Sequence, residues 1–137
     1  AVLLPAETYN PREKIRMITR LYERGDLGAV DAAVQIDDAV GGIRQVRFSP
    51  GKKFTVYTAH EGVPIPLKGE EGKSRKPTEL AVALYEVGSL RHPGVRGELT
   101  LGRDAASKHH RAGLDTLLHD FEQRHAEELQ RVRQRVA

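Results

Sequence analysis

The spacing of apolar residues along the chain predicts a pair of helices near its beginning. Residues 10–13 read Asn-Pro-Arg-Glu, which suits a helix start because Asn can cap the first free N–H groups and Pro fits the first helical position. Gly25 can end the first helix in the left-handed conformation, Asp26 can cap the second, and Gly41-Gly42 stops it. The apolar positions recur at steps of mostly three or four: Ile15, Ile18, Leu21 and Tyr22 in the first helix, and Leu27, Val30, Ala33, Val34 and Val40 in the second. The short link at residues 25–26 predicts a helical hairpin.

After these helices the period of the apolar pattern changes from that of a helix to that of a strand. Apolar and polar residues alternate on both sides of a Ser-Pro-Gly-Lys sequence at 49–52, and a Pro-Gly pair suits the middle of a tight turn. We therefore expect a β-hairpin from Ile43 to Ala59. One face of this hairpin is expected to be apolar, and the other to carry Arg44 or Arg47 together with the turn lysines.

The middle of the chain has weaker signals. Residues 61–76 are rich in Gly, Pro and charge, and they predict a mobile basic loop. Pro77 then opens a further helix with one apolar face, for which a strand through residues 80–84 is the alternative. A short strand is expected at 98–101.

The last quarter of the chain predicts one long helix over about residues 104–136, with Asp104 or Ser107 as its cap. Its apolar stripe is dense as far as Phe121 and thins beyond it; the stripe consists of Leu114, Leu117, Leu118, Phe121, His125, Leu129, Val132 and Val136. A straight helix of this length would reach beyond the core of a small domain, at about 1.5 Å per residue. We therefore expect its C-terminal half to project.

Together these elements indicate an α+β fold with a helical hairpin, a small antiparallel sheet, a further helix and a projecting C-terminal helix. We expect an extended N-terminal arm at residues 1–10, followed by one domain over residues 11–137. A chain of 137 residues is of the usual size for a single domain.

Composition narrows the classes of function. The net charge is +3 and the calculated isoelectric point is about 9.3, so attraction to nucleic acid is allowed but not required. The sequence contains no cysteine, which excludes a disulfide framework, a thiolate metal site and a cysteine nucleophile. No apolar run is long enough to span a membrane. We expect no membrane association and a location in the cytoplasm or in a soluble particle such as a virion.

Two motifs resemble catalytic or ligand-binding sequences but lack necessary parts. The Gly-Lys-Ser at residues 72–74 lacks the first glycine of a phosphate-binding loop and follows two glutamates, which repel phosphate. Asp115, His119 and Glu122 share a helical face, and Glu122 with His125 forms half of a two-metal motif, but the second half is absent from the sequence. We predict no catalytic residue, no metal site and no cofactor.

Two groups of residues are candidates for binding. The expected partner-binding residues are apolar and lie in the arm and the last helix: Val2, Leu3, Leu4, Leu129, Val132 and Val136. The residues expected to contact nucleic acid or phosphate are basic: Lys52, Lys53, Lys73, Arg75, Lys76, Lys108, His109, His110 and Arg111.

Three functions are compatible with this sequence. The first is a non-enzymatic assembly subunit that docks on other protein subunits, or on copies of itself, through the arm and the last helix. The second is a nucleic-acid-binding module that uses the basic groups, although an aromatic stacking platform is missing. The third is a metal-dependent hydrolase or nuclease that uses His109, His110, Asp115 or His119.

Overall fold

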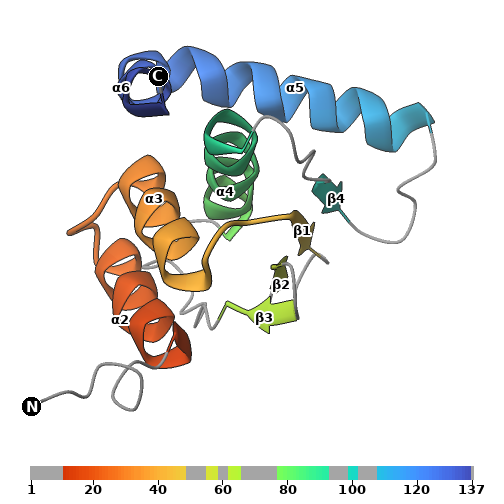
Figure 1. Ribbon diagram of the computed structural model, residues 1–137. Helices are drawn as coiled ribbons and strands as arrows, with labels where there is room; N and C mark the ends of the chain where they lie inside the picture. Colours follow the sequence, from red (N-terminus) through yellow and green to blue (C-terminus); the bar gives the residue numbers. More distant parts are fainter. Residues whose placement is uncertain are drawn as a thin grey trace, which may run out of the picture.

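The computed structural model describes residues 11–48, 55–58, 62–65, 77–92, 99–101 and 108–136. The described part is an α+β fold, as predicted, in which a central helix lies between other helices and a small sheet (Figure 1). The expected arm, the hairpin turn at 49–54 and most of the expected basic loop lie outside the described residues.

The predicted helical hairpin is present as α2 (Pro11–Glu23) and α3 (Ala29–Val40). Gly25 has a φ of 81° and Gly41 a φ of 73°, so both helices end in the left-handed conformation that glycine adopts without strain. The start of α3 differs from the prediction, because Gly28 and not Asp26 is its N-cap, and no side chain caps it. Ile15, Ile18 and Tyr22 of α2 are buried, and α2 packs on α3. Leu21, expected on the same apolar face, is instead 37% exposed at its edge.

The sheet contains the predicted hairpin and two further strands. Strand β1 (Gln45–Phe48) pairs with β2 (Thr55–Tyr57) in antiparallel fashion, with Val46 opposite Val56, and both valines are fully buried. Arg47 lies on the other face, where its guanidinium is 5.5 Å from the centre of the Tyr57 ring.

Strand β3 (Gly62–Pro64) pairs antiparallel with β2, so the predicted loop over 61–76 is wrong for its first residues. Strand β4 (Leu99–Leu101) was expected as a strand, but it pairs parallel to β1. The order is therefore β3-β2-β1-β4, and the sheet is mixed rather than purely antiparallel. Local periodicity predicts a strand but does not determine its pairing partner.

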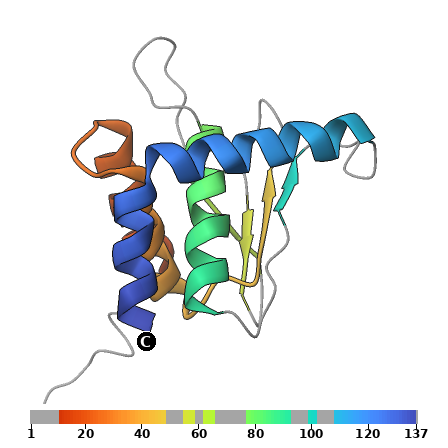
Figure 2. The ribbon, with the colours of Figure 1, turned by 90° about the horizontal axis from the view of Figure 1, so that it is seen from above.

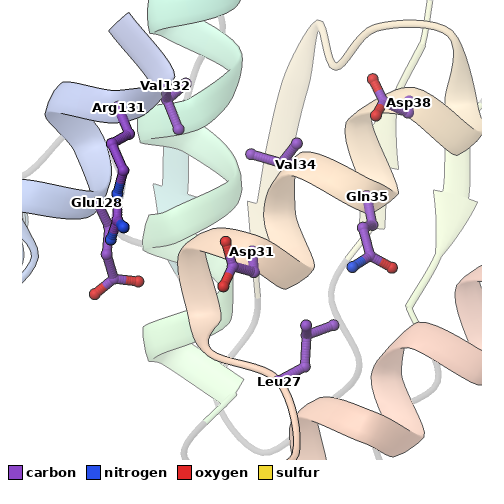
Figure 3. A pocket seen from close by; sticks show the side chains of 8 residues that line it. All are labelled: Leu27, Asp31, Val34, Gln35, Asp38, Glu128, Arg131 and Val132. Carbon is purple, nitrogen blue, oxygen red and sulfur yellow. The ribbon is translucent and has the colours of Figure 1, made fainter. Parts of the chain in front are cut away.

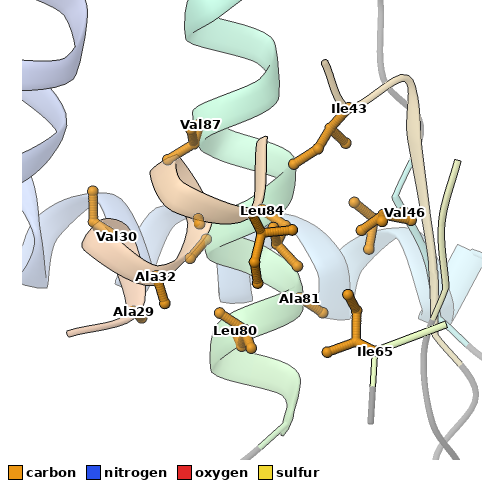
Figure 4. Close-up of a cluster of buried hydrophobic side chains, with 14 of the residues drawn as sticks. Ala29, Val30, Ala32, Ile43, Val46, Ile65, Leu80, Ala81, Leu84 and Val87 are labelled. Carbon is orange, nitrogen blue, oxygen red and sulfur yellow. The ribbon is translucent and has the colours of Figure 1, made fainter. Parts of the chain in front are cut away.

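The helix α4 (Pro77–Arg91) is the centre of the fold. The sequence predicts one apolar face, yet Ala81 and Val82 are buried as well, so the helix is enclosed on nearly all sides. Figure 4 shows the side chains of α4 packed on one side against α3 and on the other against Ile43, Val46 and Ile65. The buried residues of α4 are Leu80, Ala81, Val82, Ala83, Leu84, Glu86, Val87 and Gly88.

The predicted single C-terminal helix is two helices, α5 (Lys108–Arg124) and α6 (Ala126–Val136), which meet at His125. Figure 2 shows that α6 turns sharply away from α5 and runs beside α4. The physical reason is burial: the bend brings Leu129 and Val132 into the core, where each is less than a tenth exposed. Burying two such side chains contributes about 1.5–3 kcal/mol each.

This packing reverses the prediction about which part projects. The C-terminal half, expected to extend into solvent, packs on α4. The N-terminal half of α5 instead extends past β4, and residues 115–117 are exposed (Figures 1 and 2).

Candidate functional site

A cleft between α3 and α6 is the candidate functional site. It has a volume of about 460 Å³, and Figure 3 shows its lining side chains on α3, on α6 and on the link that precedes α3. The residues that line it are Leu27, Asp31, Val34, Gln35, Asp38, Glu128, Arg131 and Val132. The cleft exists because the chain bends at His125, since the bend places α6 beside α3.

The floor of the cleft is apolar. Leu27 and Val34 are partly buried and pack against the core, and Val132 is 7% exposed. These three side chains come from the link between α2 and α3, from α3 and from α6. They offer contact to the aliphatic part of a side chain, which gains free energy when it leaves water.

The walls of the cleft are mainly acidic, and their carboxylates differ in how far they are neutralised. Asp38 forms an ion pair with Arg91, with 2.8 Å between Oδ1 and Nη1. Oε1 of Glu128 lies 3.0 Å from Nδ1 of His125. Asp31 is exposed and forms no ion pair or hydrogen bond with the described residues, so its negative charge is available to a ligand.

Glu128 is held in place from two sides. Its Oε1 contacts His125. Its Oε2 lies close to Gly28, the N-cap of α3: a side chain at this position would place its Cβ 3.7 Å from Oε2. A carboxylate beside a helix N-terminus is stabilised by the helix dipole. The contact with His125 and the nearby start of α3 both favour this position of the Glu128 carboxylate.

His125 itself connects α6 to the central helix. Its Nε2 is 3.2 Å from Oε1 of Glu79 on α4, and its ring lies 4.3 Å from the ring of Phe121. A neutral imidazole has one N–H group, so both carboxylates receive a hydrogen bond only when the ring is protonated. His125 is thus a positioning residue for the cleft wall.

A second polar cluster joins the C-terminal ends of α3 and α4. The buried Asp37 carboxylate accepts a hydrogen bond from the Ile43 N–H at 2.8 Å and contacts Arg91 and His92 at 3.1 and 3.0 Å. No hydroxyl group of the described residues is hydrogen bonded to His92. The cluster therefore acts as a clamp between elements and shows no arrangement for nucleophilic catalysis.

A third cluster lies where α4, α5 and α6 meet. Burial of Glu86, together with its hydrogen bond to Glu122 and the negative charge of Glu122, raises the pKa of Glu86 to about 8. Arg133 on α6 acts in the opposite direction. Two carboxyl groups can hydrogen bond only if one is protonated, so this pair holds a proton at neutral pH.

Among the described residues, the basic candidates lie at the start of α5 and the apolar partner-binding candidates lie on α6. Lys108, His109, His110 and Arg111 form the first turn of α5, and Val136 ends α6. Leu129 and Val132, expected to face a partner, are buried in the core of the chain itself, because α6 packs on α4. The remaining candidates lie outside the described residues; they are Val2, Leu3, Leu4, Lys52, Lys53, Lys73, Arg75 and Lys76.

Asp115, His119 and Glu122 are the residues that were considered as metal ligands from the sequence, and for which no metal site was predicted. All three residues are exposed on α5, and the Glu122 side chain is hydrogen bonded to Glu86. Within the described ranges, no group of three or more His, Asp or Glu side chains is arranged to hold a metal ion. In the same part of the chain, no helix has the length and apolar character needed to cross a membrane.

The acidic cleft was missed by the sequence reasoning, although half of it has a recognisable signal. Asp31, Gln35 and Asp38 are spaced i, i+4 and i+7, which defines a polar stripe on α3. The other half comes from Glu128 and Arg131, which lie about 90 residues away along the chain and reach α3 only through the bend at His125.

Comparisons of the chain with protein-family models, with curated protein sequences and with solved structures found no match.

Proposed function

We propose that this protein is a non-enzymatic assembly subunit that receives a basic segment of a protein partner in the cleft between α3 and α6. The observation that carries the proposal is the combination of an apolar floor with acidic walls, one of which includes Asp31, whose carboxylate has no ion-pair partner among the described residues. Arginine and lysine match both features, because an aliphatic stem carries a cationic head.

The size of the cleft supports a protein segment as the occupant. A volume of about 460 Å³ accommodates a few side chains. The walls carry three acidic residues, Asp31, Asp38 and Glu128, and one basic residue, Arg131. This excess of negative charge favours a cationic ligand over nucleic acid or another polyanion. We propose that the protein acts in the cytoplasm or in a soluble particle such as a virion. This location is the one expected from the composition of the sequence.

The proposal is tested with a labelled amphipathic peptide built from leucine and arginine, whose sequence is unrelated to this chain. Fluorescence anisotropy measures its affinity for the unaltered chain and for the Asp31→Asn variant. We expect Asp31→Asn to weaken binding about tenfold, since it removes the unpaired wall charge. Asp115→Asn is the matched control, because Asp115 is an exposed aspartate of α5 outside the cleft.

Equal affinities for the Asp31 and Asp115 variants would mean that the peptide binds elsewhere. In that case the cleft is not a docking site and the proposed function is wrong. A rise in salt should weaken binding to the unaltered chain more than binding to Asp31→Asn, because the variant has lost part of the electrostatic attraction.

A further inference from the structure

The outward face of α2 combines exposed apolar and cationic side chains. Met17 and Leu21 are large apolar residues of α2 that are exposed to solvent, to 62% and 37% respectively. Arg20 and Arg24 are exposed beside them. These four residues are spaced i, i+3, i+4 and i+7, which is the spacing by which a helix docks into a groove. We call them the α2 stripe.

The two arginines of the α2 stripe have no acidic partner in the part of the chain that the structure describes. Arg16, on the edge of the same helix, forms an ion pair with Glu13 at 2.9 Å. Arg20 and Arg24 form no ion pair with the described residues. The stripe therefore presents two positive charges and two apolar groups, and neither property is satisfied by neighbouring elements.

The α2 stripe and the cleft complement each other in charge, polarity and length. The cleft offers Asp31 and Glu128 to the arginines, and its apolar floor suits Met17. The stripe runs from Met17 to Arg24 and the row on α3 from Asp31 to Asp38, so each covers seven helical steps and is about 10 Å long.

The two surfaces of one molecule do not meet. Helix α2 packs on α3 through Ile15, Ile18 and Tyr22, so the α2 stripe points away from α3. Figure 1 shows α3 between α2 and α6, with the cleft on the α6 side. A contact between the stripe and the cleft therefore requires two copies of the chain.

We propose that the basic segment received by the cleft is the α2 stripe of a second copy of this chain. The inference rests on the proposed function and names its partner. The two contacting surfaces differ, so the contact is heterologous. Such contacts give a closed assembly only if two copies contact each other twice or if several copies form a ring. Otherwise they give an open assembly that grows by one copy at a time.

Sedimentation velocity of the whole chain over a wide range of protein concentration tests the inference. We expect the unaltered chain to self-associate, and the association to weaken as salt increases. Arg20→Glu and Asp31→Lys should each weaken association at least about tenfold, because each places like charges opposite one another. Arg44→Glu is the matched control; Arg44 is an exposed arginine outside both surfaces, and this change should leave association intact.

The decisive variant carries Arg20→Glu and Asp31→Lys in the same chain. Its charges are exchanged between stripe and cleft, so association should recover toward that of the unaltered chain. Gln35→Lys, on the same wall of the cleft but beyond the first turn of α3, provides a second cleft variant if Asp31→Lys fails to fold. Thermal melts verify folding for every variant.

The outcomes separate this inference from the proposed function. A chain that stays monomeric at all concentrations, or a double variant that does not recover, overturns the self-contact. The proposed function still stands in that case if the leucine–arginine peptide binds at Asp31. If Arg20→Glu leaves sedimentation unchanged but abolishes salt-sensitive binding of a mixed nucleic-acid pool, the stripe binds nucleic acid and the self-contact is overturned.

Discussion

Nε2 of His92 lies 3.0 Å from Oδ2 of Asp37, although 55 residues separate the two along the chain. This contact joins the end of α3 to the end of α4, and the same carboxylate accepts the N–H of Ile43 just before β1. Three elements of the fold thus depend on one buried side chain. Helix α3, helix α4 and the start of the sheet are held relative to one another at this point.

Replacing Asp37 should therefore destabilise the protein strongly. In Asp37→Ala, the Ile43 N–H loses its acceptor, and Arg91 and His92 lose a buried counter-charge, so we expect a loss of about 3 kcal/mol in the free energy of unfolding. Urea denaturation measures this loss. Asp38→Ala is the control, because that side chain is 57% exposed and its ion pair with Arg91 should contribute less than about 1 kcal/mol. Similar losses for both variants would contradict the clamp.

The pair formed by Glu86 and Glu122 should make stability depend on pH. The pKa of Glu86 is raised from 4.5 to about 8 in the folded chain, so between these values the folded state binds more protons than the unfolded state. Stability is then greatest below pH 4.5, as far as this group is concerned, and is lost as the pH rises through about 8. We expect this loss to amount to a few kcal/mol.

Glu86→Gln should remove most of that dependence, because an amide can donate the hydrogen bond to Glu122 at any pH. The variant should be more stable than the unaltered chain above pH 8, and denaturation measured from below pH 4.5 to above pH 8 tests this. Glu127→Gln, at an exposed position of α6, should leave the pH profile unchanged. A profile of the Glu86 variant that parallels the unaltered one would contradict the assignment.

Phe121 should anchor α5 to the rest of the fold. It is 1% exposed and contacts the ring of His125, so Phe121→Ala leaves a cavity and should cost about 3–5 kcal/mol. Leu117→Ala, one turn earlier on the same helix, should cost less than about 1 kcal/mol because Leu117 is 36% exposed. Equal losses in chemical denaturation would show that the apolar stripe of α5 is buried along its whole length.

Helix α6 should be essential to the core. Leu129→Ala should cost about 2–3 kcal/mol, because this side chain is 6% exposed, whereas Gln134→Ala, at an exposed position, should have almost no effect. Removal of residues 126–137 should expose the face of α4 on which α6 packs and lower the melting temperature sharply. A truncated chain with an unchanged melting temperature would instead support a helix that projects from the core.

The sequence by itself determined the elements whose signals are local. The helical step of the apolar residues predicted the buried face of α2 except at Leu21, which is 37% exposed, and Gly25 and Gly41 marked the ends of the hairpin helices. The alternation around Val46 and Val56 predicted the paired strands. In each case the information lies within a few residues, because backbone dihedrals and side-chain periodicity are local properties.

Tertiary structure alone decided how these elements are arranged and what they form together. The bend at His125 is favoured by the contact of His125 with Glu79 on α4 and by burial of Leu129 and Val132 against distant segments, whereas the contact of His125 with Glu128 is local. The periodic apolar pattern itself continues through the bend. Burial and ion pairing between distant segments thus override helical continuity. The cleft follows from that bend, because Asp31 and Glu128 become walls of one site only when α6 lies beside α3.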